Sequence, residues 1–263
     1  MQLSPPAGAM VVPVSGVVVF GDSLSDAGNA TPGRFSNGAV WVERLAERLG
    51  HPLRPASKGG TNFAVGGART VGGGIPGLRQ QADAYLKRAR RADPDALYVV
   101  YGGGNDLRAV VEAADPHLAV LRAADTVAGI VADLAKAGAR EFLVPNLPDL
   151  GRIPEVWRRG PQAVQIATLL SAGFNEALAR SLDGVEARTR VRIHRLDVWA
   201  LLAEVLANPQ AAGFSNVTDA CVTATVCAEP DRFLFWDTVH PTAAAHAKLA
   251  EAALAALSGR PRG

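Results

Sequence analysis

Apolar positions along the chain follow two patterns that alternate with each other. Short runs rich in β-branched and aromatic residues predict buried strands, and longer stretches with an apolar residue every three or four positions predict amphipathic helices. The predicted strands are residues 16–20, 96–101, 141–145 and 191–196, with a weaker candidate at 51–55. This alternation indicates βαβ units around a mostly parallel sheet.

The predicted helices lie between these strands and after the last one. The first covers about residues 40–49, and Asn37 or Ser36 is its expected cap. The others are residues 77–91, 116–137, 161–182, 197–207 and 241–257. Residues 208–236 show no sustained period and are long for a connection inside a domain, and connections of that length are often functional.

The chain is expected to form a single domain over residues 1–263, with flexible ends at 1–13 and 258–263. Its 263 residues with 48% hydrophobic content suffice for one substantial core, and no repeat or linker divides them. The first apolar stretches are interrupted by Pro13 and by Ser15-Gly16 and have no basic residue ahead of them. We therefore expect neither a signal peptide nor a membrane span in this sequence.

Charge and cysteine content narrow the range of partners. Lys and Arg (27) nearly balance Asp and Glu (25), and the arginines are scattered, which argues against nucleic acid as a partner. Cys221 and Cys227 enclose five residues and have no further metal ligands near them in sequence. The spacing favours a local disulfide over two free thiols, and a disulfide indicates an oxidising compartment.

Ser23 follows the first predicted strand, in the stretch FGDSLSDAGN. The carboxyl ends of parallel strands form the edge at which ligands bind. A serine in such a turn is more often a cap or turn former, and a nucleophilic serine also needs a base that a carboxylate orients. The role of Ser23 therefore depends on whether the chain supplies that pair.

His240 is the histidine best suited to act as the base. It follows the apolar residues 233–236 in FLFWDTVHPTAAAH, and Asp237 stands three positions before it, so that a carboxylate can approach the imidazole. A helix cap is the alternative role for Asp237. The remaining histidines are expected to be surface or core residues: His51, His117, His194 and His246.

Two glycine-rich segments offer donors for an oxyanion. Gly66 and Gly67 in TNFAVGGART present backbone N–H groups where the absence of Cβ permits close approach. Asn105 in VVYGGGNDL follows the second predicted strand, hence lies at the same edge as Ser23, although a turn or helix cap is its alternative role. Neither segment matches a phosphate-binding loop or a dinucleotide fingerprint, and no calcium-loop spacing occurs, so no cofactor and no metal are predicted.

Four separated blocks resemble the GDSL lipase/esterase family, also called SGNH hydrolases. They are GDSL at 21–24, the Gly66-Gly67 loop, GGND at 103–106 and DTVH at 237–240, in the order that the family shows. The residues in and around these blocks are most similar to those of secreted bacterial esterases and of the catalytic domains of esterase autotransporters. The resemblance implies a three-layer α/β/α, flavodoxin-like fold with a central sheet of about five mostly parallel strands.

The resemblance also implies roles for five residues. Ser23 is the nucleophile, His240 the base and Asp237 the orienting carboxylate of a serine esterase. The backbone N–H of Ser23, that of Gly67 and the amide of Asn105 form the oxyanion hole, with the choice of Gly67 over Gly66 left open by their adjacency. The implied substrate is a small-molecule ester or lipid, and the implied location is secreted, periplasmic or at the cell surface.

Two alternatives remain at this point. The same triad serves acyltransferases and phospholipases, and a non-catalytic lipid- or carbohydrate-binding module is disfavoured because all the expected catalytic positions are occupied. Residues 72–78 and 208–236 are expected to shape the substrate groove. Four aromatic residues of the second segment suggest an acyl-accepting wall, with core packing as the alternative role: Phe214, Phe233, Phe235 and Trp236.

Overall fold

The computed structural model describes residues 13–30, 33–111 and 115–259. Most of the ends that were expected to be flexible, at 1–13 and 258–263, lie outside these ranges. Ser258 and Gly259 are described, and their backbone N–H groups are hydrogen-bonded to carbonyls of the preceding helical turn. None of the helices in the described ranges combines the length and the apolar character that crossing a bilayer requires.

The central sheet contains the four strongly predicted strands. They are β1 (Val17–Gly21), β2 (Leu97–Tyr101), β3 (Glu141–Pro145) and β4 (Arg192–Leu196), all parallel and in the order β1-β2-β3-β4. The weaker candidate at 51–55 is not a strand. Instead residues 61–65 run along the free edge of β1, where Val19 bonds to Thr61 and Phe63 and Gly21 to Val65, and they occupy the position of a fifth strand.

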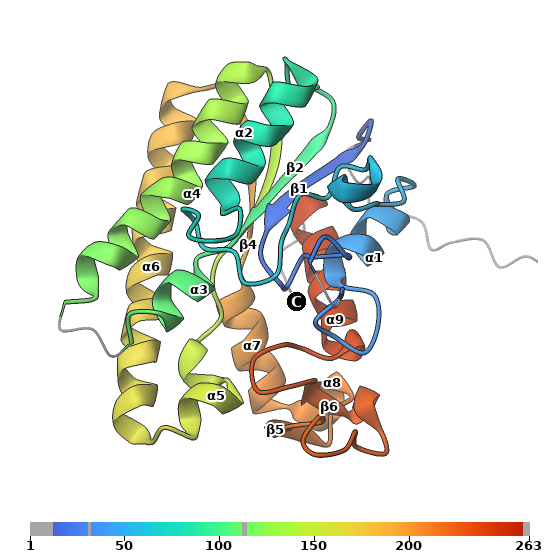
Figure 1. Ribbon diagram of the computed structural model, residues 1–263, viewed down its shortest axis with the longest axis vertical. Coiled ribbons are helices and arrows are strands. Elements are labelled where there is room, and N and C mark those ends of the chain that lie inside the picture. The colour runs from blue at the N-terminus through green and yellow to red at the C-terminus, as the bar shows by residue number, and fades with distance from the viewer. Residues whose placement is uncertain (1–12, 31–32, 112–114, 260–263) are drawn as a thin grey trace, which may run out of the picture.

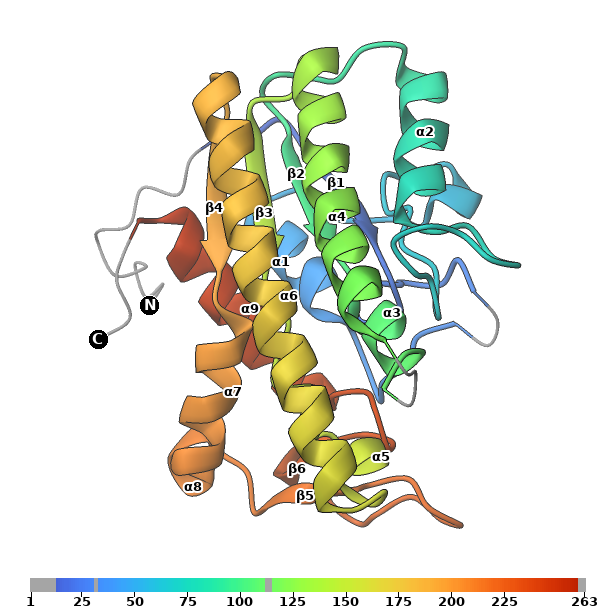
Figure 2. The ribbon, with the colours of Figure 1, turned by 90° about the vertical axis from the view of Figure 1, so that its left-hand side faces the viewer.

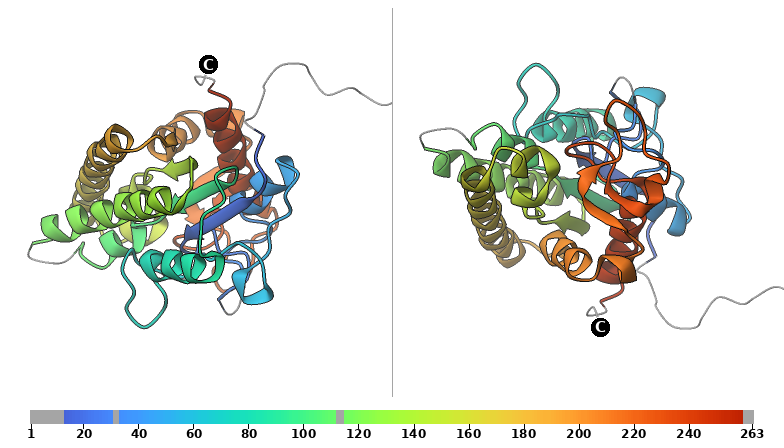
Figure 3. Two further views of the ribbon diagram at one scale, coloured as in Figure 1. Left: turned by 90° about the horizontal axis from the view of Figure 1, so that it is seen from above. Right: turned by 90° about the horizontal axis from the view of Figure 1, so that it is seen from below.

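Helices cover both faces of this sheet, which confirms the three-layer α/β/α prediction (Figure 1). One face carries α2 (Leu78–Ala89), α4 (His117–Ala137) and α6 (Pro161–Arg188). The other face carries α1 (Trp41–Arg48) and α9 (Ala243–Leu257), as the view along the sheet in Figure 3 shows. Because both faces are covered, β1 and β2 are buried over their whole length, which explains their uninterrupted apolar sequences.

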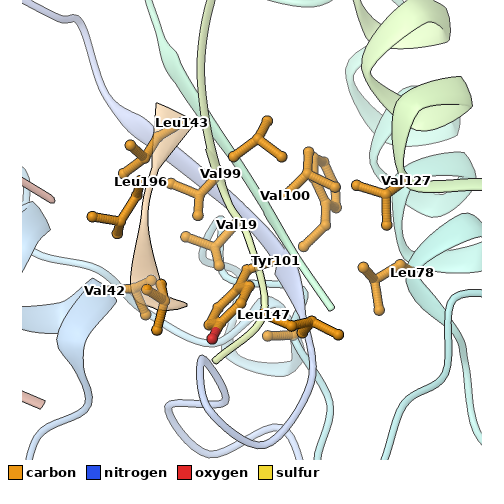
Figure 4. Close-up of a cluster of buried hydrophobic side chains, with 14 of the residues drawn as sticks. Val19, Val42, Leu78, Val99, Val100, Tyr101, Val127, Leu143, Leu147 and Leu196 are labelled. Carbon is orange, nitrogen blue, oxygen red and sulfur yellow. The ribbon is translucent and has the colours of Figure 1, made fainter. Parts of the chain in front are cut away.

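The core lies between these layers. Figure 4 shows Val19, Val99 and Leu143 from three neighbouring strands, with Leu78 and Val127 from the helices on one side and Val42 on the other. These side chains are at most 1% exposed. The packed core fixes the positions of the strand ends, from which the loops of the site begin.

Neither Asn37 nor Ser36, the predicted caps of α1, caps that helix. Val40 precedes α1, and its N–H is bound by the carboxylate of Glu43 (3.0 Å). Asn37 instead accepts from the N–H of Ala243 (2.7 Å) at the start of α9, and the Ser36 hydroxyl donates to the carbonyl of Pro241 (2.9 Å). Residues 36 and 37 therefore tie the loop before α1 to the start of α9.

Short helices follow the carboxyl ends of β2, β3 and β4. They are α3 (Gly104–Arg108) after β2, α5 (Pro154–Trp157) after β3 and α7 (Val198–Ala207) after β4, together with the 3₁₀ turn η2 (Leu150–Arg152). A further 3₁₀ turn, η1 (Ala56–Lys58), lies beside the edge of β1. Helix α7 and its neighbours extend beyond the sheet on this side (Figure 2).

Residues 208–236, here called the cap, have a structure of their own, contrary to the expected irregular connection. They contain α8 (Pro209–Ala212), η3 (Pro230–Arg232) and a small parallel sheet of β5 (Asn216–Ala220) and β6 (Phe233–Phe235). Cys221 and Cys227 form the predicted disulfide, with Cα atoms 4.9 Å apart. The cap lies beyond the carboxyl edge of the central sheet, beside α5 and α7 (Figures 1 and 2).

His246 is a buried histidine of α9, so of the surface and core roles expected for it the structure shows the core one. It is 1% exposed, and its Nδ1 accepts from the N–H of Trp41 (3.3 Å) at the start of α1. Its Nε2 is buried without a hydrogen-bond partner among the described residues. Burial, with smaller contributions from the charges of His240 and Arg44, lowers the pKa of His246 to about 3.

The buried imidazole predicts a loss of stability in acid. Below pH 6.5 the unfolded chain takes up a proton that folded His246 refuses until about pH 3, so its contribution to stability falls across that window. Between pH 7 and pH 5, His246 lowers the free energy of unfolding by about 2 kcal/mol. Urea unfolding of the wild type and of His246→Gln at both pH values measures this loss. Equal pH dependence in the two proteins would contradict it.

Candidate active site

Ser23 lies in the turn after β1, at the carboxyl edge of the sheet. The strand ends at Gly21, where a Cβ would stand 2.8 Å from the carbonyl oxygen of Tyr101 in β2. Only glycine therefore permits this close approach of the two strands. The turn itself is held by Asp22, whose carboxylate accepts from the N–H of Leu24 (3.0 Å), and Ser23 is 7% exposed.

His240 reaches Ser23 from the loop before α9. Its Nε2 lies 2.9 Å from Ser23 Oγ, and its Nδ1 lies 2.7 Å from Asp237 Oδ2. A carboxylate only accepts, so Nδ1 carries the proton and Nε2 is left to accept from the serine hydroxyl. The structure thus brings together the three residues that the sequence singled out, in a continuous chain of hydrogen bonds.

The loop also fixes Asp237. Its Oδ1 accepts from the N–H groups of Val239 (2.8 Å) and His240 (2.7 Å), so one carboxylate closes the turn and orients the imidazole. Partial burial raises the pKa of Asp237, but the hydrogen bonds and charge of His240 and the two backbone donors outweigh it and hold the pKa below its usual value. Asp237 is therefore an anion at neutral pH.

Phe35 packs against His240 and was not identified from the sequence. The two rings are 5.1 Å apart at a tilt of 32°. The Phe35 ring also lies close to Gly66, where a Cβ would overlap the ring. Gly66 is therefore required for packing, and its N–H is already bound by Asp26 (2.8 Å).

Gly67 and Asn105 are the remaining predicted residues. Gly67 is exposed, has φ +78, and its N–H has no hydrogen-bond partner among the described residues; the same holds for the N–H of Ser23. Asn105 stands in the first turn of α3 and donates one amide hydrogen to the carbonyl of Ala68 (2.9 Å). The second amide hydrogen remains available.

Arg108 holds the amide of Asn105 from its other side and was also missed. Its guanidinium donates to Asn105 Oδ1 (2.9 Å) and to the carboxylate of Glu155 (2.8 Å). Glu155 in turn donates its backbone N–H to the carbonyl of Thr238 (2.8 Å), in the loop of Asp237 and His240. Both ends of the Asn105 amide are thus bonded, which fixes the amide orientation.

Asp22 is a second carboxylate close to the imidazole, in a different environment. It is 5% exposed. Burial raises the pKa of Asp22 to about 6, against the lowering effects of the Leu24 hydrogen bond and the charge of His240. Within the described residues, no three His, Cys, Asp or Glu side chains converge as metal ligands.

A cavity opens beside Ser23 and extends along the edge of the sheet. Its empty volume, part of it open to solvent, is about 1000 Å³. Ser23, Asn105 and Arg108 line one end, and apolar residues of α7, the cap and α9 line most of the remainder. Gly67 and His240 do not belong to its lining. The site therefore joins a polar cluster to an extended apolar space.

Comparisons with known proteins identify the family of the chain. The profile of the GDSL-like Lipase/Acylhydrolase family matches residues 17–253. An uncharacterized protein in the trpE-trpG intergenic region of Pseudomonas putida is 34% identical over 94% of this chain and 49% of its own length. Lipase 1 of Photorhabdus luminescens is 30% identical over 87% of this chain and 48% of its own length. The chain thus spans about half the length of these relatives.

A solved structure shares the fold. An acetylxylan esterase variant from Geobacillus stearothermophilus superimposes with a TM-score of 0.57 at 17% identity, covering 97% of this chain and 100% of that one. This similarity supports the fold class, and the family profile covers all four blocks of the site. The chain belongs to the GDSL-like lipase/acylhydrolase family, a family of ester hydrolases.

Proposed function

We propose that the protein hydrolyses carboxylic esters with Ser23 as its nucleophile. The observation that carries the proposal is the unbroken hydrogen-bond chain from Asp237 through His240 to Ser23. A serine hydroxyl is a weak nucleophile by itself, and a neutral imidazole at hydrogen-bond distance, oriented by a carboxylate, is the arrangement that activates it. The disulfide of the cap supports an oxidising, extracytoplasmic location.

In the proposed reaction, Ser23 Oγ attacks the ester carbonyl while His240 Nε2 takes the hydroxyl proton. The Asp237 anion stabilises the imidazolium that forms. Collapse of the tetrahedral intermediate expels the alcohol, which receives the proton from His240. Water then attacks the acyl-enzyme by the same route and regenerates Ser23.

The oxyanion is assigned to three donors: the N–H of Ser23, the N–H of Gly67 and the side-chain amide of Asn105. Two observations support this set. The N–H of Gly66 is occupied by Asp26, whereas that of Gly67 has no partner within the described residues. Asn105 retains one free amide hydrogen and lines the same cavity as Ser23.

Arg108 is a positioning residue in this proposal. By donating to Asn105 Oδ1 it keeps the amide nitrogen directed toward the site, and its charge polarises the amide. The same guanidinium connects through Glu155 to the loop of His240. One side chain thus links the anion-stabilising amide to the loop that carries the base.

The first prediction from the proposed function concerns the nucleophile. Ser23→Ala abolishes turnover of p-nitrophenyl acetate, and a fluorophosphonate probe labels the wild type but not the variant, while both proteins show the same melting temperature. Product analysis with and without an added alcohol distinguishes hydrolysis from acyl transfer. Retention of most esterase activity by the alanine variant would refute the assignment.

The second prediction tests whether Arg108 acts through Asn105. Asn105→Ala lowers kcat by about 10²–10³, as for other oxyanion donors. Arg108→Met leaves the Asn105 amide in place but no longer orients it, so kcat falls less than in Asn105→Ala, by about tenfold. KM changes less than kcat. In the Asn105→Ala background Arg108→Met has no further effect, because its target amide is absent.

Glu155→Gln is the matched control for the Arg108 pair. It weakens the ion pair of Arg108 but keeps the hydrogen bond from Arg108 to Asn105 and the backbone bond to Thr238. Its effect on kcat is therefore smaller than that of Arg108→Met. Effects of Asn105→Ala and Arg108→Met that multiply in the double variant would show that Arg108 acts independently.

The third prediction concerns the support of His240. Gly66→Ala displaces the Phe35 ring, which packs against His240, and therefore lowers both kcat and the free energy of unfolding, the latter by about 1–3 kcal/mol. Gly73→Ala is the control, because no described atom lies within 4 Å of the added methyl group. Urea unfolding and esterase rates of both variants provide the measurement. If Gly66→Ala behaves like Gly73→Ala, Phe35 does not restrain the imidazole.

A further inference from the structure

The cavity beside Ser23 follows the carboxyl ends of all four strands in order. Ser23 comes after β1, Asn105 after β2, Leu147 after β3 and Val198 after β4, and each of them lines the cavity. The cavity therefore crosses the whole edge of the sheet, from the hydroxyl of Ser23 to helix α7. This edge is where open α/β sheets bind ligands.

The far wall of the cavity is apolar and comes from two elements. Helix α7 contributes Val198, Leu201, Leu202 and Val205, which recur at helical spacing on one face, and the cap contributes Phe214. Phe214 is 1% exposed and Val205 is 6% exposed. The two charged side chains Asp22 and Arg108 lie at the Ser23 end, and Lys248 of α9 is the further charged residue of the lining.

This distribution argues against a sugar or polyol as the occupant of the far part. Each hydroxyl group of such a ligand would lose its water contacts against valine and leucine side chains, and a buried polar group without a partner costs about 1–3 kcal/mol. A polymethylene chain has no polar group to desolvate there and gains from burial. The part of the ester that enters this space is thus apolar, and its carbonyl stays beside Ser23 and Asn105.

We propose that the cavity binds the acyl chain of the ester and selects chains of about ten to twelve carbons by its length. The inference rests on the proposed function, since it places the ester carbonyl at Ser23. From β1 to β4 the cavity crosses three strand spacings, or about 14 Å. An extended chain advances about 1.2 Å per backbone bond, so about eleven or twelve bonds fill this distance.

The loop of residues 72–78, expected from the sequence to shape the groove, does not line this cavity. Of the four aromatic residues suggested as an acyl wall, Phe214 and Phe235 line it, and Phe233 and Trp236 do not. Chain length is therefore determined at α7 and the cap, on the side of Ser23 toward β4. The alcohol part of the ester is directed away from them.

The test is a chain-length profile of kcat/KM with p-nitrophenyl esters from acetyl to palmitoyl. In the wild type kcat/KM rises up to about fourfold per added methylene, as burial of each methylene predicts, and stops rising near ten to twelve carbons. Val205→Phe fills the far end and lowers the ratio of the dodecanoyl to the butyryl rate at least tenfold. Leu201→Ala widens the wall and shifts the profile toward longer chains.

Ala203→Phe is the matched control, because it adds a phenyl group to the exposed face of the same helix, outside the cavity lining. Its profile remains that of the wild type. A wild-type preference for acetyl esters, or parallel profiles for Val205→Phe and Ala203→Phe, would overturn the acyl-chain proposal. Fluorophosphonate labelling of Ser23 in every variant shows that the site is folded.

The two proposals fail in different ways. If Ser23→Ala retains hydrolysis of all the esters, the nucleophile is wrong and the cavity no longer has a defined carbonyl end. If Ser23 is labelled and short esters turn over, but chain length and the α7 variants have no effect, the esterase function stands and the acyl-chain site alone is refuted.

Discussion

The hydrogen bond between Ser23 Oγ and His240 Nε2 joins parts of the chain that are 217 residues apart in sequence. Neither residue can reach the other unless the whole sheet and both helical layers are in place. Ser23 is fixed by the close approach of Gly21 to β2. His240 is fixed by Asp237 and, through the start of α9, by Ser36 and Asn37. The reactivity of the serine is therefore a property of the complete fold.

Two carboxylates near one imidazole have opposite environments, and the difference separates their roles. Asp237 receives the imidazole N–H and two backbone N–H groups, which stabilise its charge and keep its pKa low. Asp22 is buried with a single backbone donor, so its pKa is raised to about 6. Asp237, which orients His240, therefore stays ionised at low pH, whereas Asp22 becomes protonated and loses its charge in mild acid.

The sequence was sufficient to predict the strands and helices whose pattern of apolar residues is continuous along the chain. The buried strands are continuous apolar runs because both faces of the sheet are covered, and the residues after their carboxyl ends converge because the strands are parallel. Ser23 and Asn105 could thus be placed at one edge, because each follows a strand of this sheet. His240 was instead assigned from Asp237, three positions before it, and from the family resemblance.

The features that the sequence did not reveal depend on distant contacts. Phe35 is a single aromatic residue in a polar loop. Its role depends on its contacts with Gly66 and His240, which are distant in sequence. Asn37 is of a residue type that often caps helices, but its side chain accepts the first N–H of α9, at Ala243, and not an N–H of the helix that follows it. Strands β5 and β6 are short and lack a clear period, so periodicity could not identify them.

The cap connects the disulfide, the cavity and the base in one small element. The N–H of Trp236 donates to the carbonyl of His240 (2.7 Å), directly after β6. The N–H of Cys221 donates to the carbonyl of Phe235 (3.0 Å), and Phe235 lines the cavity. A displacement of β6 would therefore change the cavity wall and the position of the imidazole together. The short disulfide loop is bonded to β6 and restrains that displacement.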